Sequence, residues 1–249
     1  MAISADPYER IIWSADVDDV ATLTDWVDQI PKLRLIKIDR AFVDRNGWDV
    51  FDILRERGVY VFDDAKITEI PTKLELVAKI HVDKARPWML NCMAGSLSTL
   101  ETGAGHRELD GLRRFADVCA EADVHSCAVS VLTSKSEFAV ESEFNGRTST
   151  EQVLFYAERL VALGITHLVC SPREAEVVRK YFDFTELQLV TPGVRPVGEA
   201  VGDQARVSTP ESAIKNGANY LVVGRPITQG KGTPAENLDA IAAEIQQFV

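Results

Sequence analysis

Short apolar runs alternate along the chain with longer stretches in which apolar residues recur every three or four positions. The first pattern predicts buried strands and the second predicts amphipathic helices. The strand-like runs fall at residues 11–16, 33–38, 59–64, 88–93, 125–132, 167–170, 187–191 and 220–223. A helical stretch follows each run, which indicates a parallel sheet covered by crossover helices. Eight such units in 249 residues predict an α/β fold, a single (β/α)8 TIM barrel that spans residues 1–249 as one domain.

Several predicted helices begin with a capping signal, in which Ser or Thr is followed three residues later by Glu or Gln. The pairs with this spacing are Ser149 with Gln152, Ser171 with Glu174, and Thr233 with Glu236. A proline follows Ser171 and Thr233 directly, at the first helical position, where its fixed φ is favourable. These signals agree with the helix boundaries that the apolar pattern predicts.

The composition, 46% hydrophobic and 26% charged, is that of a globular protein. A net charge of −11 argues against a general binder of nucleic acid or of anionic membranes, although a local basic site still suits an anionic ligand. No apolar run is long enough to span a membrane, and no signal-peptide pattern opens the chain. The four cysteines lack Cys-x-x-Cys spacing and the four histidines are scattered, so we expect a cytoplasmic protein with buried thiols and no metal site.

A charged run follows the third predicted strand and ends at Pro71, which suits the first turn of a helix. Strand alternation places Asp64 and Lys66 on one face, close to the carboxyl end of the strand. Enzymes with this fold keep their catalytic residues at such strand-to-helix junctions. The competing interpretation is a solvated loop with a chance ion pair.

Further polar residues end the other predicted strands and would share the same mouth of the barrel. Asp16 ends the first strand, Lys37 lies in the second, and Thr133 and Ser134 follow the fifth. The seventh and eighth loops, the usual phosphate site of this fold, supply Arg195, Arg225 and the backbone at Gly224. The glycine-bearing loop at residues 195–204 is long enough to act as a lid.

Together these residues resemble the orotidine 5'-phosphate decarboxylase family over nearly the whole chain. Residues 64–71, Asp-Ala-Lys-Ile-Thr-Glu-Ile-Pro, are similar to the family signature Asp-x-Lys-x-x-Asp-Ile-Pro. Asp16 and Lys37 stand at the first-strand aspartate and the second-strand lysine of the family. The most specific matches lie in the C-terminal segments 190–196, 202–204 and 223–227.

The resemblance implies a cofactor-free homodimer that converts orotidine 5'-phosphate, a phosphorylated nucleotide, to uridine 5'-phosphate. Lys37, Asp64, Lys66 and Glu69 would form the catalytic tetrad, with Lys66 as proton donor and Glu69 reaching the active site of the partner subunit. The substrate-binding residues would be Asp16, Thr72, Lys73, Thr133, Ser134, Pro192, Arg195, Gln204, Gly224 and Arg225.

The chain departs from the family pattern at a few positions beside the expected ribose and partner-subunit contacts. Glu69 stands in place of aspartate, Lys73 in place of threonine, and Asp39 in place of glycine, and Cys92-Met93 replaces a segment with histidine. The phosphate-binding residues keep the family pattern. Two alternatives to decarboxylation of orotidine 5'-phosphate therefore stay open: a paralogue acting on another phosphorylated nucleotide or sugar acid, and a non-catalytic ligand-binding homologue.

Overall fold

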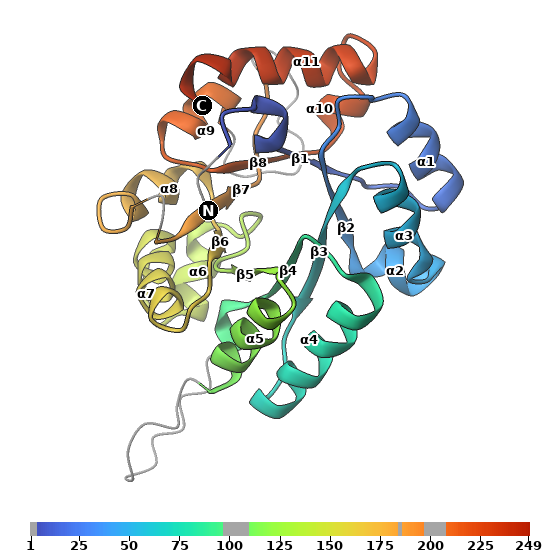
Figure 1. Cartoon of the computed structure of the whole chain (residues 1–249). Coiled ribbons are helices and arrows are strands. Elements are labelled where there is room, and N and C mark those ends of the chain that lie inside the picture. Colours follow the sequence, from blue (N-terminus) through green and yellow to red (C-terminus); the bar gives the residue numbers. More distant parts are fainter. Residues whose placement is uncertain (1–3, 97–109, 184–185, 197–207) are drawn as a thin grey trace, which may run out of the picture.

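The computed structural model describes residues 4–96, 110–183, 186–196 and 208–249. Eight parallel strands pair in chain order, and β8 pairs with β1 to close a barrel, which confirms the predicted (β/α)8 fold (Figure 1). The strands are β1 (Ile11–Ser14), β2 (Leu35–Asp39), β3 (Tyr60–Ile67), β4 (Met89–Met93), β5 (His125–Val129), β6 (His167–Val169), β7 (Gln188–Thr191) and β8 (Tyr220–Val223).

Helices surround this ring of strands (Figure 1). They are α1 (Val20–Asp28), α2 (Arg40–Asn46), α3 (Asp49–Glu56), α4 (Pro71–Ala85), α5 (Asp110–Glu121), α6 (Glu137–Glu143), α7 (Ser149–Ala162), α8 (Pro172–Val178), α9 (Pro210–Lys215), α10 (Arg225–Thr228) and α11 (Pro234–Ile245). Short 3-10 turns occupy Pro7–Arg10, Ala94–Ser96 and Gln246–Phe248. No helix in the described part of the chain is long and apolar enough to cross a membrane.

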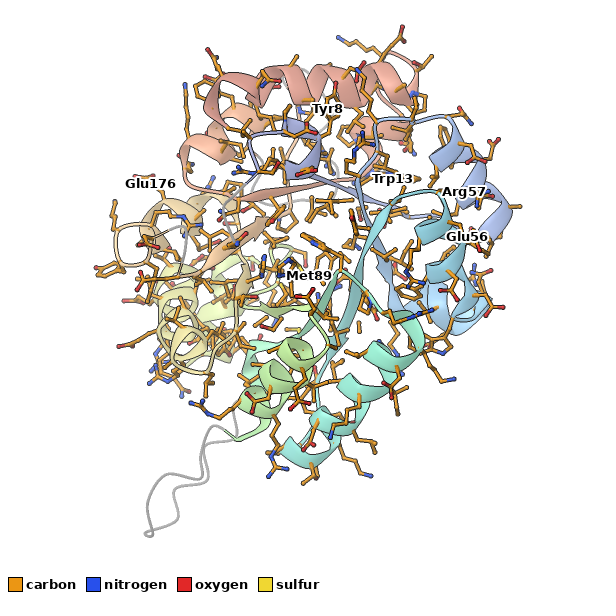
Figure 2. The ribbon with its side chains drawn as sticks, in the orientation of Figure 1. Tyr8, Trp13, Glu56, Arg57, Met89 and Glu176 are labelled. Carbon is orange, nitrogen blue, oxygen red and sulfur yellow. The ribbon has the colours of Figure 1, made fainter. Side chains whose placement is uncertain are left out.

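The strands bury side chains on both of their faces, as their continuous apolar runs predict. One face fills the barrel interior, where Phe62, Met89 and Val222 belong to a single buried cluster. The other face packs against the helices, as Trp13 does from β1. In Figure 2, Met89 lies inside the ring of strands, whereas Glu56 and Glu176 lie on the outer helices. This packing holds the carboxyl ends of the strands at one mouth.

The structure corrects three expectations about individual elements. The capping box of α7 is formed by Thr148 and Glu151, one residue earlier than the predicted pair of Ser149 and Gln152. Ser149 instead donates its backbone N–H and its hydroxyl to Glu137. Strand β3 runs three residues further than predicted, to Ile67. The sequence pattern predicted one helical stretch after each strand, whereas α2, α6 and α10 are additional short helices that precede α3, α7 and α11. The capping boxes at Ser171 and Thr233 are confirmed.

A hollow of about 880 Å³ lies at the amino ends of the strands, opposite the mouth that carries the polar residues. Arginines and carboxylates line it together, including Arg34, Arg86 and Asp83. At the same end, the rings of His125 and His167 pack 4.8 Å apart, centre to centre. Burial lowers the pKa of both imidazoles, which suits the structural role expected for them. Because positive and negative side chains both line this hollow, its charge does not favour one class of ligand.

Candidate active site

A cavity of about 280 Å³ opens at the carboxyl ends of the strands. Its floor is apolar and is made by inward side chains of the barrel, among them Phe62, Val129, Val190 and Val222. Its charged and polar lining comes from the ends of six strands and the loops that follow them, and it includes Asp16, Lys37, Asp64, Lys66, Thr133, Arg195 and Arg225. An apolar floor beneath converging charged groups is the usual form of a small-molecule site.

The Asp64 carboxylate is the centre of the charged group. Its Oδ2 atom lies 2.9 Å from Nζ of Lys37 and 2.6 Å from Nζ of Lys66. The side chain of Asp64 is 7% exposed and that of Lys37 is 14% exposed, whereas Lys66 is 42% exposed. Two ammonium groups thus share one carboxylate oxygen, and one of them remains open to the cavity and to solvent.

These contacts fix the charge states of the group. Burial alone would raise the pKa of Asp64, but the adjacent Lys37 and Lys66 ammonium groups outweigh it and hold that pKa at about 2. Burial likewise disfavours the charged form of Lys37, but the Asp64 carboxylate, together with the charges of Asp16 and Asp39, outweighs burial and raises the pKa of Lys37. Both groups are therefore ionised at neutral pH.

The backbone of β3 is irregular where it carries the charged residues. The register between β3 and β4 shifts between Asp63 and Ile67. Lys66 has a φ of +46°, in the left-handed region that side chains other than glycine rarely adopt. The expected proximity of Asp64 and Lys66 is therefore reached through a bulge and not through the regular strand alternation that predicted it.

Asp63 faces the helices on the outer side of β3. Its Oδ2 lies 2.7 Å from Nδ1 of His81 on α4, and both side chains are buried. Burial raises the pKa of Asp63 more strongly than His81 lowers it. The edge of the Trp48 ring packs against the His81 ring, with centres 5.0 Å apart. The contact between Asp63 and His81 therefore joins β3 to α4, the helix that begins just after Glu69.

The seventh and eighth loops form the opposite side of the cavity. Arg195, Gly193 and Pro192 line it after β7, and Gly224 and Arg225 line it after β8. Arg195 is only 8% exposed, whereas Arg225 is exposed. At Gly224, an added Cβ would lie in van der Waals contact with the backbone oxygen of Ser14, at 3.4 Å. Two guanidinium groups beside a glycine backbone suit a phosphate dianion.

Not every residue predicted for the site lines this cavity. Glu69 lies just before α4, and Thr72 and Lys73 lie in its first turn. All three are exposed and stay outside the lining of this subunit's cavity. Ser134 is also exposed and is not part of the lining, whereas Thr133 before it lines the cavity. Gln204 and most of the proposed lid lie outside the described residues. The roles assigned to all of these residues stay predictions.

One departure from the family pattern has a local structural reason. Asp39 caps α2, because its carboxylate accepts the backbone N–H of Phe42 at 2.9 Å. The short helix that it caps follows directly after the strand carrying Lys37. Asp39 therefore fixes the point at which β2 ends and α2 begins.

Two polar residues near the cavity were not identified from the sequence. Ser14 lines the cavity, and its hydroxyl lies 3.4 Å from Oδ1 of Asp16. Asn91 is fully buried in β4 and hydrogen-bonds Asp64. The sequence feature that could have indicated Asn91 is its amide side chain within the otherwise apolar run at residues 88–93. Among residues 4–96, 110–183, 186–196 and 208–249, no group of three or more His, Cys, Asp or Glu could hold a metal ion.

Comparison with known proteins gives the family. The family model described as "Orotidine 5'-phosphate decarboxylase / HUMPS family" matches residues 9–241. The orotidine 5'-phosphate decarboxylase of Moorella thermoacetica is 36% identical over 242 residues, covering 96% of this chain and 92% of its own. That of Actinobacillus succinogenes is 33% identical over 237 residues, covering 95% and 97%. The chain belongs to the orotidine 5'-phosphate decarboxylase / HUMPS family.

Structural comparison agrees with this family assignment. A crystal structure of orotidine 5'-phosphate decarboxylase from Lactobacillus acidophilus superposes with a TM-score of 0.76 at 26% identity, covering 94% of this chain and 97% of that one. The expectation of an enzyme related to the orotidine 5'-phosphate decarboxylases is thereby confirmed. The Asp64–Lys66 segment and the Arg225 loop both lie within the matched residues.

Proposed function

We propose that this family member decarboxylates orotidine 5'-phosphate to uridine 5'-phosphate, without a cofactor and with Lys66 as the proton donor. The observation that carries the proposal is the Asp64 carboxylate held between the ammonium groups of Lys37 and Lys66, at a cavity whose other side carries two arginines. The names of the relatives support the same substrate.

The proposed reaction uses the charges of the site in sequence. Arg195 and Arg225 bind the phosphate, and this binding energy holds the pyrimidine ring over the charged group. The ionised Asp64 lies beside the substrate carboxylate, so that loss of carbon dioxide relieves a repulsion. The bond between the ring carbon and the carboxylate breaks, and its electron pair stays on the ring carbon.

Lys66 completes the proposed step. Its ammonium group stabilises the electron pair on the ring carbon and then transfers a proton to that carbon. The Lys66 side chain is 42% exposed, so that it can regain a proton from water after product release. Lys37 keeps Asp64 ionised and is itself charged, because each group stabilises the ionised form of the other.

Homodimerisation in the cytoplasm is part of the proposal, with Glu69 entering the cavity of the partner subunit. Its support is the exposure of Glu69 outside its own cavity and the exposed apolar side chains of Ile70, Leu76 and Ile80 that follow it. Light scattering of the purified protein tests this point. We expect twice the mass of the 27.5 kDa chain, and a monomer at assay concentration would contradict it.

Incubation of the purified protein with orotidine 5'-phosphate tests the function. We expect uridine 5'-phosphate and carbon dioxide in equal amounts, with loss of the orotate absorbance. Unchanged substrate, with activity on a different phosphorylated acid, would overturn the substrate assignment. If phosphorylated nucleotides do not raise the melting temperature at all, the binding proposal also fails.

A further inference from the structure

We propose that Asn91 is a positioning residue, which holds the Asp64 carboxylate and the Lys66 backbone in their reactive arrangement. The proposal rests on the decarboxylation proposed above. Asn91 lies in β4, between Leu90 and Cys92, and its side chain is fully buried. Burying an amide without hydrogen bonds costs free energy, so that the large majority of buried amides are hydrogen-bonded.

The Asn91 amide makes two contacts with the neighbouring strand. Its Nδ2 donates to Oδ1 of Asp64 at 2.7 Å, and its Oδ1 accepts the backbone N–H of Lys66 at 2.6 Å. The partners define the orientation of the amide, since a carboxylate only accepts and a backbone N–H only donates. One side chain thus contacts both residues that the proposed reaction needs.

Because of the first contact, the two carboxylate oxygens of Asp64 bind different partners. Oδ2 receives both ammonium groups, and Oδ1 receives the Asn91 amide. A carboxylate held at both oxygens cannot rotate about its terminal bond without losing a hydrogen bond. Asn91 therefore fixes the orientation in which Asp64 meets the substrate.

The second contact acts on the irregular backbone of β3. The register with β4 shifts between Asp63 and Ile67, and Lys66 there has its left-handed φ. Asn91 gives the Lys66 N–H an acceptor within this shift. The direction in which the Lys66 side chain leaves the strand depends on that backbone, so that loss of the acceptor displaces its ammonium group.

Asn219 provides a matched control at the other end of the barrel. It is also fully buried, and its Oδ1 accepts the backbone N–H of Leu189 at 2.7 Å and a hydrogen bond from the Arg179 guanidinium. In the described part of the chain, however, its Nδ2 has no hydrogen-bond partner. Asn219→Asp therefore keeps the acceptor and removes no bond, whereas Asn91→Asp removes the donor to Asp64 and places a second carboxyl group beside it.

The activity test compares kcat and KM for orotidine 5'-phosphate in these variants. We expect Asn91→Ala to lower kcat on the order of 10²-fold, the effect of about 1 Å of misplacement, with a smaller change in KM. Asn91→Ser, which restores a hydroxyl that can donate and accept, should recover part of the loss. Asn219→Asp should keep the kcat of the unmodified protein.

The pH profile separates positioning from a general loss of structure. In Asn91→Asp, a proton shared between the new carboxyl group and that of Asp64 can take the place of the hydrogen bond from the amide. Raising the pH removes this proton, so that the activity of Asn91→Asp should fall as the pH rises. The other groups that face this position are Lys66, Lys37 across Asp64, and the Cys127 thiol of β5, which burial keeps neutral. Asn219→Asp should keep the pH profile of the unmodified protein.

Amide hydrogen exchange by NMR on the ligand-free protein tests the geometry without any activity. We expect faster exchange at Lys66 in Asn91→Ala and partial protection in Asn91→Ser, with Leu189 unchanged in both. Failure of the unmodified protein to turn over orotidine 5'-phosphate would refute the function and leave this measurement valid. Unchanged Lys66 exchange in Asn91→Ala, or a kcat within threefold of the unmodified protein, would overturn the role of Asn91.

Discussion

Replacing Asp64 with asparagine tests how much the ionised Asp64 carboxylate, held by Lys37 and Lys66, contributes to the free energy of unfolding. The pKa of Asp64 is about 2 in the folded protein, against an ordinary value of 3.8. Because the folded value is the lower one, the stabilisation is present above pH 4 and is lost as the pH falls towards 2. The difference between the two pKa values corresponds to about 2 kcal/mol in the free energy of unfolding. Of this stabilisation, about 1 kcal/mol is lost between pH 6 and pH 3.

The assay is urea denaturation of the unmodified protein and of Asp64→Asn at several pH values between 6 and 3. The difference between their free energies of unfolding should shrink by about 1 kcal/mol over this range. Asp63→Asn is the control, because burial raises the pKa of Asp63 and its pH dependence must have the opposite sign. A difference for Asp64→Asn that stays constant down to pH 3 would refute the reasoning.

Two further predictions concern catalysis. Lys66→Ala should lower turnover of orotidine 5'-phosphate by about 10²- to 10⁴-fold, because it removes the proton donor. Binding of uridine 5'-phosphate, measured by calorimetry, should change little, and turnover within tenfold of the unmodified protein would exclude Lys66 as the donor. Glu69→Asp shortens the side chain by one methylene and should raise kcat for orotidine 5'-phosphate, by at most about 10²-fold. A lower kcat would show instead a site adapted to glutamate.

Much of the barrel could be predicted because its strands are continuous apolar runs. The end of β3 could not, since the charged residues from Asp63 to Lys66 hide the strand pattern, and a bulge then changes its alternation. The start of α7 was ambiguous, because Thr148 with Glu151 and Ser149 with Gln152 both have capping spacing. The packing decides between them: Gln152 is buried, and Ser149 bonds to Glu137.

The candidate site was predictable where residues end neighbouring strands. Lys37, Asp64 and Lys66 meet because parallel strands place their carboxyl ends at one mouth. Asn91 was not predictable, since its role depends on the shifted register between β3 and β4, which no local pattern reveals. Glu69 was assigned by resemblance, and a contact between subunits cannot be derived from the pattern of one chain.

Reaction of the purified protein with orotidine 5'-phosphate, followed by chromatography of the nucleotides, tests the central claim most directly. We predict that uridine 5'-phosphate forms without any added cofactor, and that Lys66→Ala lowers its rate of formation by about 10²- to 10⁴-fold. Orotidine 5'-phosphate that stays intact with the unmodified protein, while uridine 5'-phosphate still binds, would contradict the claim.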